Sequence, residues 1–269
     1  MSHPSPSSKK ESLKRPGGFI FDYGGTIDTR GCHWGKMLWH AYERQQVPVS
    51  EVAFREAYVY AERTLGKNPI IQSSYTFHTT LKVKLRIEMD YLRERYMKTL
   101  STTEEEHLVE TLLADLYERV LETTAESRKA LEILAGDFPL VLVSNFYGNI
   151  GVVLEEFNLA HLFRHVIESA VVGVRKPNPA IFQMGADALG LMPGDIVVVG
   201  DNYDKDLLPA HGMGCRTIWV KGEEWTPQAE RECFAEAVLT DGLATLPSLF
   251  GMAGGNEETT TFIKGTNQN

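Results

Sequence analysis

The hydrophobic positions of this 269-residue chain follow two different patterns. Short continuous runs of Val, Ile, Leu and Phe, typical of strands buried on both faces of a sheet, occur near residue 20 and again after residue 138. Between them, roughly from residue 33 to 124, apolar residues recur at helical spacing. We therefore predict an α/β protein whose sheet is interrupted in sequence by a helical insertion.

The predicted insertion carries clear helix start signals. Ser50 stands at an N-cap position, and the stretch 101–104 offers a capping box before another amphipathic run. Residues 81–89 also alternate with period two, which is the pattern of a half-buried strand. Because no Gly or Pro interrupts residues 79–99 and helical spacing persists, we predict a broadly buried helix there.

From about Ala125 onward, predicted helices and strands alternate. We expect helices at 127–134, 150–157 and 178–189, with Asn178 as the N-cap of the last and Pro179 in its first turn. We expect strands at 139–144, 165–168, 196–199 and 217–220, and an edge strand at 237–240. This alternation is typical of a doubly wound, Rossmann-like parallel sheet, whose ligands bind at the carboxyl ends of its strands.

These patterns predict a domain organisation. Residues 1–16 are rich in Ser, Pro and Lys and form a disordered tail in this prediction, because they have too few apolar side chains to offset the entropy of ordering. The Rossmann-like core comprises 17–32 and 125–252, and the helical insertion comprises 33–124. A C-terminal tail covers 253–269.

Composition narrows the classes of partner. The net charge is −9 without a basic block in the folded part, so we expect no nucleic-acid partner. The three cysteines lack C-x-x-C spacing, which argues against a zinc site or a disulfide framework. No apolar run approaches the roughly 18 residues of a membrane helix. We expect a cytoplasmic protein with a small-molecule ligand and no membrane partner; oligomeric state is not indicated.

Polar residues follow the ends of several predicted strands. They are Asp22 with Thr26, Ser144 with Asn145, Lys176, and Asp201 with Asp206. Because the carboxyl ends of parallel strands share one edge of the sheet, these residues should converge on one crevice.

This ordered set of motifs resembles the haloacid dehalogenase-like superfamily. The motifs are Asp-x-x-Gly-Thr at Asp22, Ser-Asn at Ser144, Gly-x-x-Lys-Pro-x-Pro around Lys176, and Gly-Asp at Asp201 followed by a further Asp. The resemblance covers about residues 18–250 and implies that the helical insertion is a cap at the family's first insertion point.

If the substrate is a phosphomonoester, the chemistry of phosphoryl transfer gives each of these residues a role. Asp22 would be a carboxylate nucleophile that forms an aspartyl-phosphate. Mg²⁺, which prefers oxygen ligands, would be held by Asp22, Asp201 and the main-chain carbonyl of Gly24. Substrate binding would involve Thr26, the hydroxyl of Ser144, the amide of Asn145 and the ammonium of Lys176, and Asp206 would orient Lys176 or a metal-bound water.

The sequence departs from the family's phosphatase pattern at Gly24. Phosphatases of the family usually carry an aspartate at this position, which protonates the leaving group; such acid/base catalysis contributes about 10²–10⁴-fold. His33 and Lys36, just after the loop, are cap candidates for a replacement or for the substrate contact made by a cap lysine in phosphonate-cleaving relatives. Asp28 is nearby, but nothing in the sequence shows that it can replace the missing acid.

The leading hypothesis is a Mg²⁺-dependent phosphatase that acts on a small phosphorylated metabolite. A second is a phosphonate-cleaving relative, or a haloacid-cleaving relative in which Arg30 could bind a substrate carboxylate. A third is a catalytically impaired protein that binds a metabolite.

Overall fold

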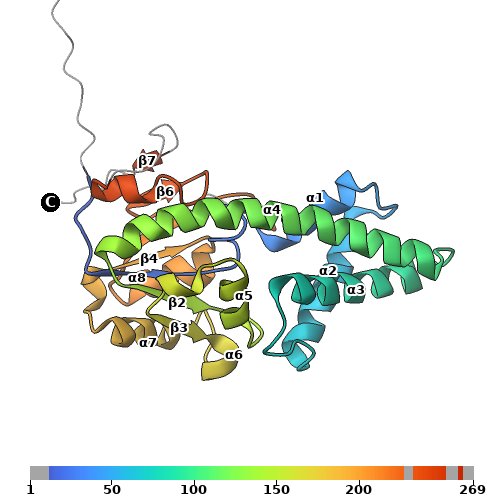
Figure 1. Ribbon diagram of the computed structural model, residues 1–269, viewed down its shortest axis with the longest axis horizontal. Coiled ribbons are helices and arrows are strands. Elements are labelled where there is room, and N and C mark those ends of the chain that lie inside the picture. The colour runs from blue at the N-terminus through green and yellow to red at the C-terminus, as the bar shows by residue number, and fades with distance from the viewer. Residues whose placement is uncertain (1–11, 227–232, 253–259, 263–269) are drawn as a thin grey trace, which may run out of the picture.

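The computed structural model describes residues 12–226, 233–252 and 260–262. At its centre is a seven-stranded sheet in the order β3-β2-β1-β4-β5-β6-β7 (Figure 1). The strands are β1 (Gly18–Phe21), β2 (Leu140–Ser144), β3 (His165–Glu168), β4 (Ile196–Gly200), β5 (Arg216–Val220), β6 (Ala237–Leu239) and β7 (Thr260–Phe262). Strands β1 to β6 are parallel, which confirms the predicted α/β fold class.

The prediction that 237–240 is an edge strand was wrong. Strand β7 pairs antiparallel with β6 and covers its outer edge. Residues 260–262 belong to the predicted C-terminal tail, and pairing a further strand satisfies the backbone groups that an open edge would expose. The rest of that tail beyond residue 252 lies outside the described residues, as do residues 1–11 of the predicted N-terminal tail. Within the described part of the latter, the N–H of Leu13 donates to the carbonyl of Leu249 at 2.7 Å.

Both faces of the sheet are buried, as the continuous apolar runs require. In β1, Phe19 and Phe21 belong to one buried cluster with side chains of α4 and α5, whereas Ile20 belongs to a second cluster with side chains of α7. This alternation follows from the two-residue repeat of a strand. The helices outside the insertion are α5 (Ile150–Glu156), α6 (Ser169–Val172), α7 (Ala180–Leu189) and α8 (Leu208–Gly212), with short helical turns η1 (Ala160–Leu162), η2 (Pro193–Asp195), η3 (Tyr203–Leu207) and η4 (Leu246–Phe250).

Four helices lie between β1 and β2 in sequence. They are α1 (Trp34–Arg44), α2 (Glu51–Lys67), α3 (Phe77–Arg95) and α4 (Thr102–Asp137), and we call them the inserted helices. The Ser50 hydroxyl caps α2 by accepting from the N–H of Ala53 at 3.3 Å, and Ser101 and Glu104 form the predicted capping box. Helix α3 confirms the helical interpretation of the ambiguous stretch, although it ends at Arg95.

Helix α4 is one continuous element of 36 residues. The separate helix predicted at 127–134 was therefore wrong, because it is the last part of α4. The hydroxyls of Thr123 and Thr124 donate to the carbonyls of Arg119 and Val120, which satisfies these polar groups inside the helix. Figure 1 shows α4 running from above the sheet to alongside α3. The predicted boundary between core and cap, between residues 124 and 125, thus falls within α4, and the division into these two domains stays a prediction.

Helix α7 begins later than predicted. Its N-cap is Pro179, not Asn178, and the Asn178 side chain accepts from the N–H of Ala180 at 3.0 Å instead. The N-cap therefore has no side-chain hydrogen bond of its own.

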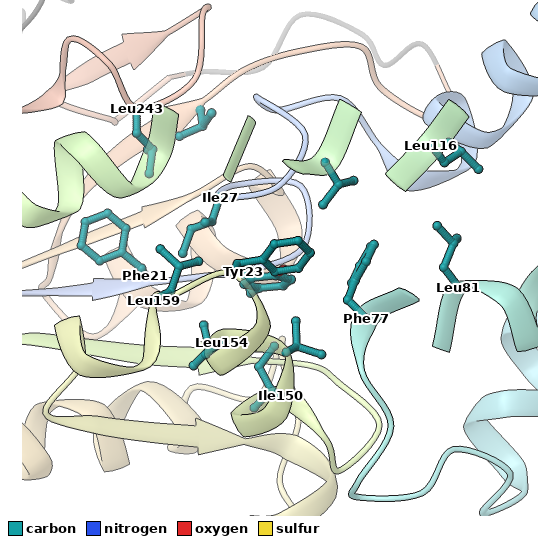
Figure 2. Close-up of a cluster of buried hydrophobic side chains, with 14 of the residues drawn as sticks. Phe21, Tyr23, Ile27, Phe77, Leu81, Leu116, Ile150, Leu154, Leu159 and Leu243 are labelled. Carbon is teal, nitrogen blue, oxygen red and sulfur yellow. The ribbon is translucent and has the colours of Figure 1, made fainter. Parts of the chain in front are cut away.

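One buried cluster joins the sheet to the inserted helices. Figure 2 shows Phe21, Tyr23 and Ile27, from β1 and the loop after it, in the same cluster as Phe77 and Leu81 of α3. The loop that follows β1 is therefore packed between the two parts of the molecule. Among the helices of the described residues, none is long and apolar enough to cross a membrane.

Candidate active site

A buried lysine joins two aspartates at the carboxyl ends of the strands. The Nζ of Lys176 donates to Asp206 Oδ1 at 2.6 Å and also to Asp22 Oδ1. All three side chains are buried. Although burial disfavours its charge, the two carboxylates raise the pKa of Lys176 above its ordinary value. Lys176 is therefore an ammonium beside the proposed nucleophile.

The loop after β1 brings Asp22 close to Asp201. The hydroxyl of Thr26 lies 3.2 Å from Asp201 Oδ1 and 3.4 Å from Asp22 Oδ2, so it can donate to either carboxylate. Gly25 has φ +101°, and a Cβ at this position would enter the space of the Asp201 carboxylate. Glycine is thus required at position 25 for both its backbone conformation and this close approach.

Three carboxylates gather at this point. One oxygen each from Asp22, Asp201 and Asp206 lies within 4.8 Å of the others. Burial, together with the charges of Asp22 and Asp206, raises the pKa of Asp201 well above its ordinary value. Burial also raises the pKa of Asp206 to about 6, against the effect of Lys176. The all-oxygen donor set and this excess of negative charge fit a hard divalent cation such as Mg²⁺.

Ser144 is the last residue of β2 and Asn145 follows it, and Asn145 holds the segment that carries Lys176. The Asn145 Nδ2 donates to the Lys176 carbonyl at 3.1 Å, and its Oδ1 accepts from the Lys176 N–H at 2.9 Å. The Asn145 side chain therefore holds the main chain at Lys176, and the proposed donation from the amide of Asn145 to a phosphoryl oxygen stays a prediction. Ser144 is buried, and it is one of the residues that line a cavity at these strand ends.

A cavity of about 200 Å³ lies between these strand ends and the inserted helices. Its lining includes these residues from the predicted site: Asp22, Gly24, His33, Ser144, Asn145, Lys176, Asp201 and Asp206. The inserted helices contribute Tyr58 and Glu62 from α2 and Phe77, Thr80, Leu81 and Lys84 from α3. Polar groups with opposite charges and several aromatic rings therefore face one cavity, as in many small-molecule sites.

The two cap candidates lie in different places. His33 lines the cavity, where its Nδ1 accepts from the N–H of Gly35 at 3.0 Å and its ring stacks on Trp225. Burial lowers the pKa of His33 to about 4, so it is neutral at pH 7. Lys36 is absent from the lining and pairs with Glu51 and Glu223 at 3.3 and 3.4 Å.

Arg30 is also absent from the cavity lining. Its guanidinium pairs with Glu126 on α4, with Nε 3.0 Å from the carboxylate. The geometry therefore gives no support to a role for Arg30 in binding a substrate carboxylate.

Asp28 is buried beneath the loop, outside the cavity lining. Its carboxylate accepts from the N–H of Gly25 at 2.7 Å and from Trp34 Nε1 at 3.0 Å. Burial raises the pKa of Asp28 to about 7, although these two hydrogen bonds oppose the shift. Asp28 thus fixes the loop and the Trp34 ring, which lies beside Gly24.

Sequence reasoning did not identify Lys84 and Glu62 as site residues. Lys84 stands on α3 between the buried residues Leu81 and Leu85, and a lysine at a position expected to be buried was the available signal. Glu62 comes from α2, and which face of α2 lines the cavity depends on packing that local sequence does not specify.

Comparisons with known proteins agree with this architecture. The curated relatives include a phosphoserine phosphatase of Thermus thermophilus, 44% identical over 62 residues that cover 23% of this chain and 25% of that protein. They also include (S)-2-haloacid dehalogenase 2 of a Pseudomonas species, 30% identical over 130 residues that cover 48% of this chain and 56% of that protein. The aligned stretches thus span about a quarter and about half of these relatives.

The solved structures with a similar fold include a dehalogenase with a TM-score of 0.58, although it is only 17% identical. The superposition covers 88% of this chain and 98% of that chain, and it supports the fold alone. The profile of the haloacid dehalogenase-like hydrolases matches residues 17–214, which is most of the chain. The chain therefore belongs to the haloacid dehalogenase-like hydrolases.

Proposed function

We propose that this chain is a Mg²⁺-dependent phosphatase that acts on a small phosphorylated metabolite. The observation that carries the proposal is the Lys176 ammonium between Asp22 and Asp206, with Asp201 close enough to share a cation. This set provides a nucleophile, a fixed positive charge and a metal site on one cavity wall. The phosphoserine phosphatase among the relatives supports the same reaction class.

In the proposed reaction, an oxygen of Asp22 attacks phosphorus in line with the ester oxygen. The new bond joins Asp22 to phosphorus, the ester P–O bond breaks, and its electron pair leaves with the alcohol oxygen, which takes a proton from solvent. Water later cleaves the aspartyl-phosphate, which releases phosphate and restores the Asp22 carboxylate. The ammonium of Lys176 and the hydroxyl of Ser144 stabilise charge on the phosphoryl oxygens. When bound by Asp22, Asp201 and the Gly24 carbonyl, Mg²⁺ would neutralise the repulsion between carboxylates and a phosphate dianion.

The leaving oxygen has no carboxylic acid beside it at position 24. His33 is a poor replacement because its low pKa leaves it without a proton to donate at pH 7. The proposal therefore expects slow turnover of substrates whose leaving groups need protonation.

The two alternative reactions receive less support. A haloacid reaction would need a residue for the substrate carboxylate, and Arg30 is paired with Glu126 away from the cavity. In a phosphonate-cleaving reaction, a lysine that attacks the carbonyl of the substrate would have to be a neutral amine. Lys36 lies outside the cavity, and the carboxylate of Glu62 keeps Lys84 protonated against the effect of burial by raising its pKa well above the ordinary value.

The test is phosphate release from an activated aryl phosphate, with and without Mg²⁺. An activated leaving group needs little protonation, so the assay is insensitive to Gly24 and reports on nucleophile and metal. We expect Mg²⁺-dependent release that falls at least about 10³-fold in Asp22→Asn. Asp137→Asn, at an exposed carboxylate paired with Arg15 at the end of α4, serves as the matched control. Release that survives in Asp22→Asn would overturn the mechanism.

A further inference from the structure

The wall of the cavity opposite the strands carries an ion pair. Lys84 Nζ of α3 donates to Glu62 Oε1 of α2, and the hydroxyl of Tyr147 donates to the same oxygen at 3.3 Å. The Lys84 ammonium also lies 4.6 Å from the centroid of the Tyr58 ring. All four residues line the cavity, so the pair faces the space in front of Asp22.

This pair is built into the structure. The Lys84 side chain is only 10% exposed, whereas Glu62 is 38% exposed. Burying an ammonium is favourable only when its charge is compensated, and the Glu62 carboxylate provides that compensation. Tyr147 belongs to the loop after β2, so the pair is held from both the inserted helices and the core.

With all of its carboxylates ionised, as cation binding requires, the cavity carries as many positive as negative side chains. Among the described residues that line it, the cations are Lys84, Arg175, Lys176 and Lys205, and the carboxylates are Asp22, Glu62, Asp201 and Asp206. One bound divalent cation would add two positive charges, which a phosphate dianion would balance. No net charge then remains to pair with a charged group on the rest of the substrate.

We propose that Lys84 and Glu62 select phosphomonoesters whose alcohol part is uncharged and hydroxylated. This inference rests on the proposed phosphatase function and names its substrate class. A hydroxyl can accept from the ammonium and donate to the carboxylate, so it joins the pair without breaking it. A carboxylate on the substrate would be repelled by Glu62, and an ammonium would be repelled by Lys84.

An apolar alcohol is disfavoured for a different reason. It would displace water from the pair without replacing the hydrogen bonds that water makes, and unsatisfied charged groups are costly. The aromatic rings of Trp34 and Phe77, 5.6 Å apart in the same cavity, can still contact the carbon skeleton of a hydroxylated substrate.

The experiment compares kcat/KM for three phosphate esters of similar size in the presence of Mg²⁺. Glycerol 1-phosphate is uncharged beyond its phosphate, 3-phosphoglycerate adds a carboxylate, and phosphoethanolamine adds an ammonium. We expect the unsubstituted protein to prefer glycerol 1-phosphate at least about tenfold over either charged ester. A preference of the unsubstituted protein for either charged ester would overturn the proposal.

Removing one charge of the pair should weaken this preference, and the two possible substitutions should favour substrates of opposite charge. Glu62→Gln leaves Lys84 unpaired and should raise the ratio for 3-phosphoglycerate over glycerol 1-phosphate about tenfold. Lys84→Gln should do the same for phosphoethanolamine. Lys82→Gln is the matched control, because Lys82 lies on the same helix but pairs with Glu110 and is absent from the cavity lining.

The test stands even if Lys84→Gln, which removes a buried ammonium, fails to fold. Glu62→Gln preserves the shape of a side chain that is more than a third exposed, so its ratio tests the pair without Lys84→Gln. Equal ratios in the unsubstituted protein, Glu62→Gln and Lys82→Gln would contradict it.

The aryl phosphate assay separates this inference from the proposed function, because the aryl ester has neither a hydroxylated nor a charged alcohol part. If the aryl ester is cleaved but the ratios stay flat, only the inference fails. If no ester is cleaved, the phosphatase proposal fails, and Kd values of the three esters measured by calorimetry with Mg²⁺ test the selection instead. The same ranking and the same shifts are then expected in Kd.

Discussion

Lys176 Nζ lies 2.6 Å from Asp206 Oδ1, although Lys176 lies in the segment before α7 and Asp206 lies in η3. The same ammonium donates to Asp22, so Asp206 determines where the charge of Lys176 lies relative to the proposed nucleophile. Asp206 also accepts from the N–H of Asn202 at 3.1 Å, which fixes the carboxylate itself. These contacts make Asp206 a positioning residue for Lys176.

Asp206→Asn should lower kcat on the aryl phosphate about 10- to 100-fold with a smaller effect on KM. An amide keeps the shape of the carboxylate but holds the ammonium less firmly, because its oxygen carries no full charge. Asp187→Asn on α7, where Asp187 accepts from Gln183 at 2.8 Å, is the control. A rise in KM at unchanged kcat would indicate that Asp206 serves substrate binding instead.

Mg²⁺ should stabilise the folded protein through the aspartate cluster. A cation that binds only the native state raises the unfolding midpoint with concentration, and a hundredfold excess over Kd contributes about 2.7 kcal/mol. Asp201→Asn should remove most of this shift because it deletes one of the carboxylates. Thermal unfolding with Mg²⁺ and with EDTA measures it, and a full shift in Asp201→Asn would place the cation elsewhere.

Gly24→Asp should raise kcat on a substrate with a poor leaving group by about 10-fold or more, because it adds a carboxylic acid near the leaving oxygen. The structure leaves room for it: a Cβ at Gly24 would have Trp34 Nε1 as its nearest neighbour, at 3.8 Å. Gly24→Asn is the matched control, since it has the same shape without a carboxylic acid. The rate on the activated aryl phosphate should change little. Equal rates for the Asp and Asn variants would show that no acid acts from this position.

The segment after β5 connects to the inserted helices through Trp225. Its ring contacts Tyr58, with centroids 4.8 Å apart, and the Arg55 guanidinium lies 3.8 Å from the ring centroid. The Arg55 Nη2 also donates to the Trp225 carbonyl at 3.0 Å. Trp225→Ala should therefore lower the free energy of unfolding by about 2 kcal/mol, less than for a fully buried Trp. Trp225→Phe should recover part of the loss in urea unfolding. Similar stability for all three proteins would show that the ring contributes nothing.

Several site residues from the core could be predicted because they lie at the end of a strand or directly after it. The carboxyl ends of parallel strands meet at one edge, so Asp22, Ser144 and Asp201 needed only correct strand positions. Lys84 and Glu62 have no such rule, because a helix can rotate without changing its own apolar pattern. Lys36 shows the same limit, since its side chain pairs with carboxylates away from the cavity.

Most helices and strands could also be predicted from the sequence, but the length of α4 and the pairing of β7 could not. The continuous strand runs and the capping serines gave the elements, because these signals are local. The length of α4 was not foreseen, since the pair Thr123 and Thr124 looks like a helix boundary until their hydroxyls are seen to donate within the helix. The pairing of β7 with β6 depends on contacts across more than twenty residues of chain and has no local signal.

The last prediction concerns Glu88, a fully buried carboxyl on α3. Its Oε2 accepts from the Tyr42 hydroxyl at 3.3 Å, whereas its Oε1 has no hydrogen-bond partner. Burial raises the pKa of Glu88 from 4.5 to about 7, although Lys84 opposes the shift. The folded state thus binds this proton more tightly than the unfolded state. Its stabilising effect is complete below pH 4.5, falls as the pH rises and is lost above about pH 7.

Glu88→Gln should remove this pH dependence. In the unsubstituted protein, Glu88 should lower the free energy of unfolding by on the order of 2–3 kcal/mol between pH 4.5 and pH 8. The slope is the readout, because a buried Gln amide has a desolvation cost of its own at every pH. Urea unfolding across this range should give a flatter profile for Glu88→Gln than for the control Glu94→Gln, an exposed position on the same helix. Parallel profiles would mean that Glu88 is ionised in the folded protein and is compensated by Lys84.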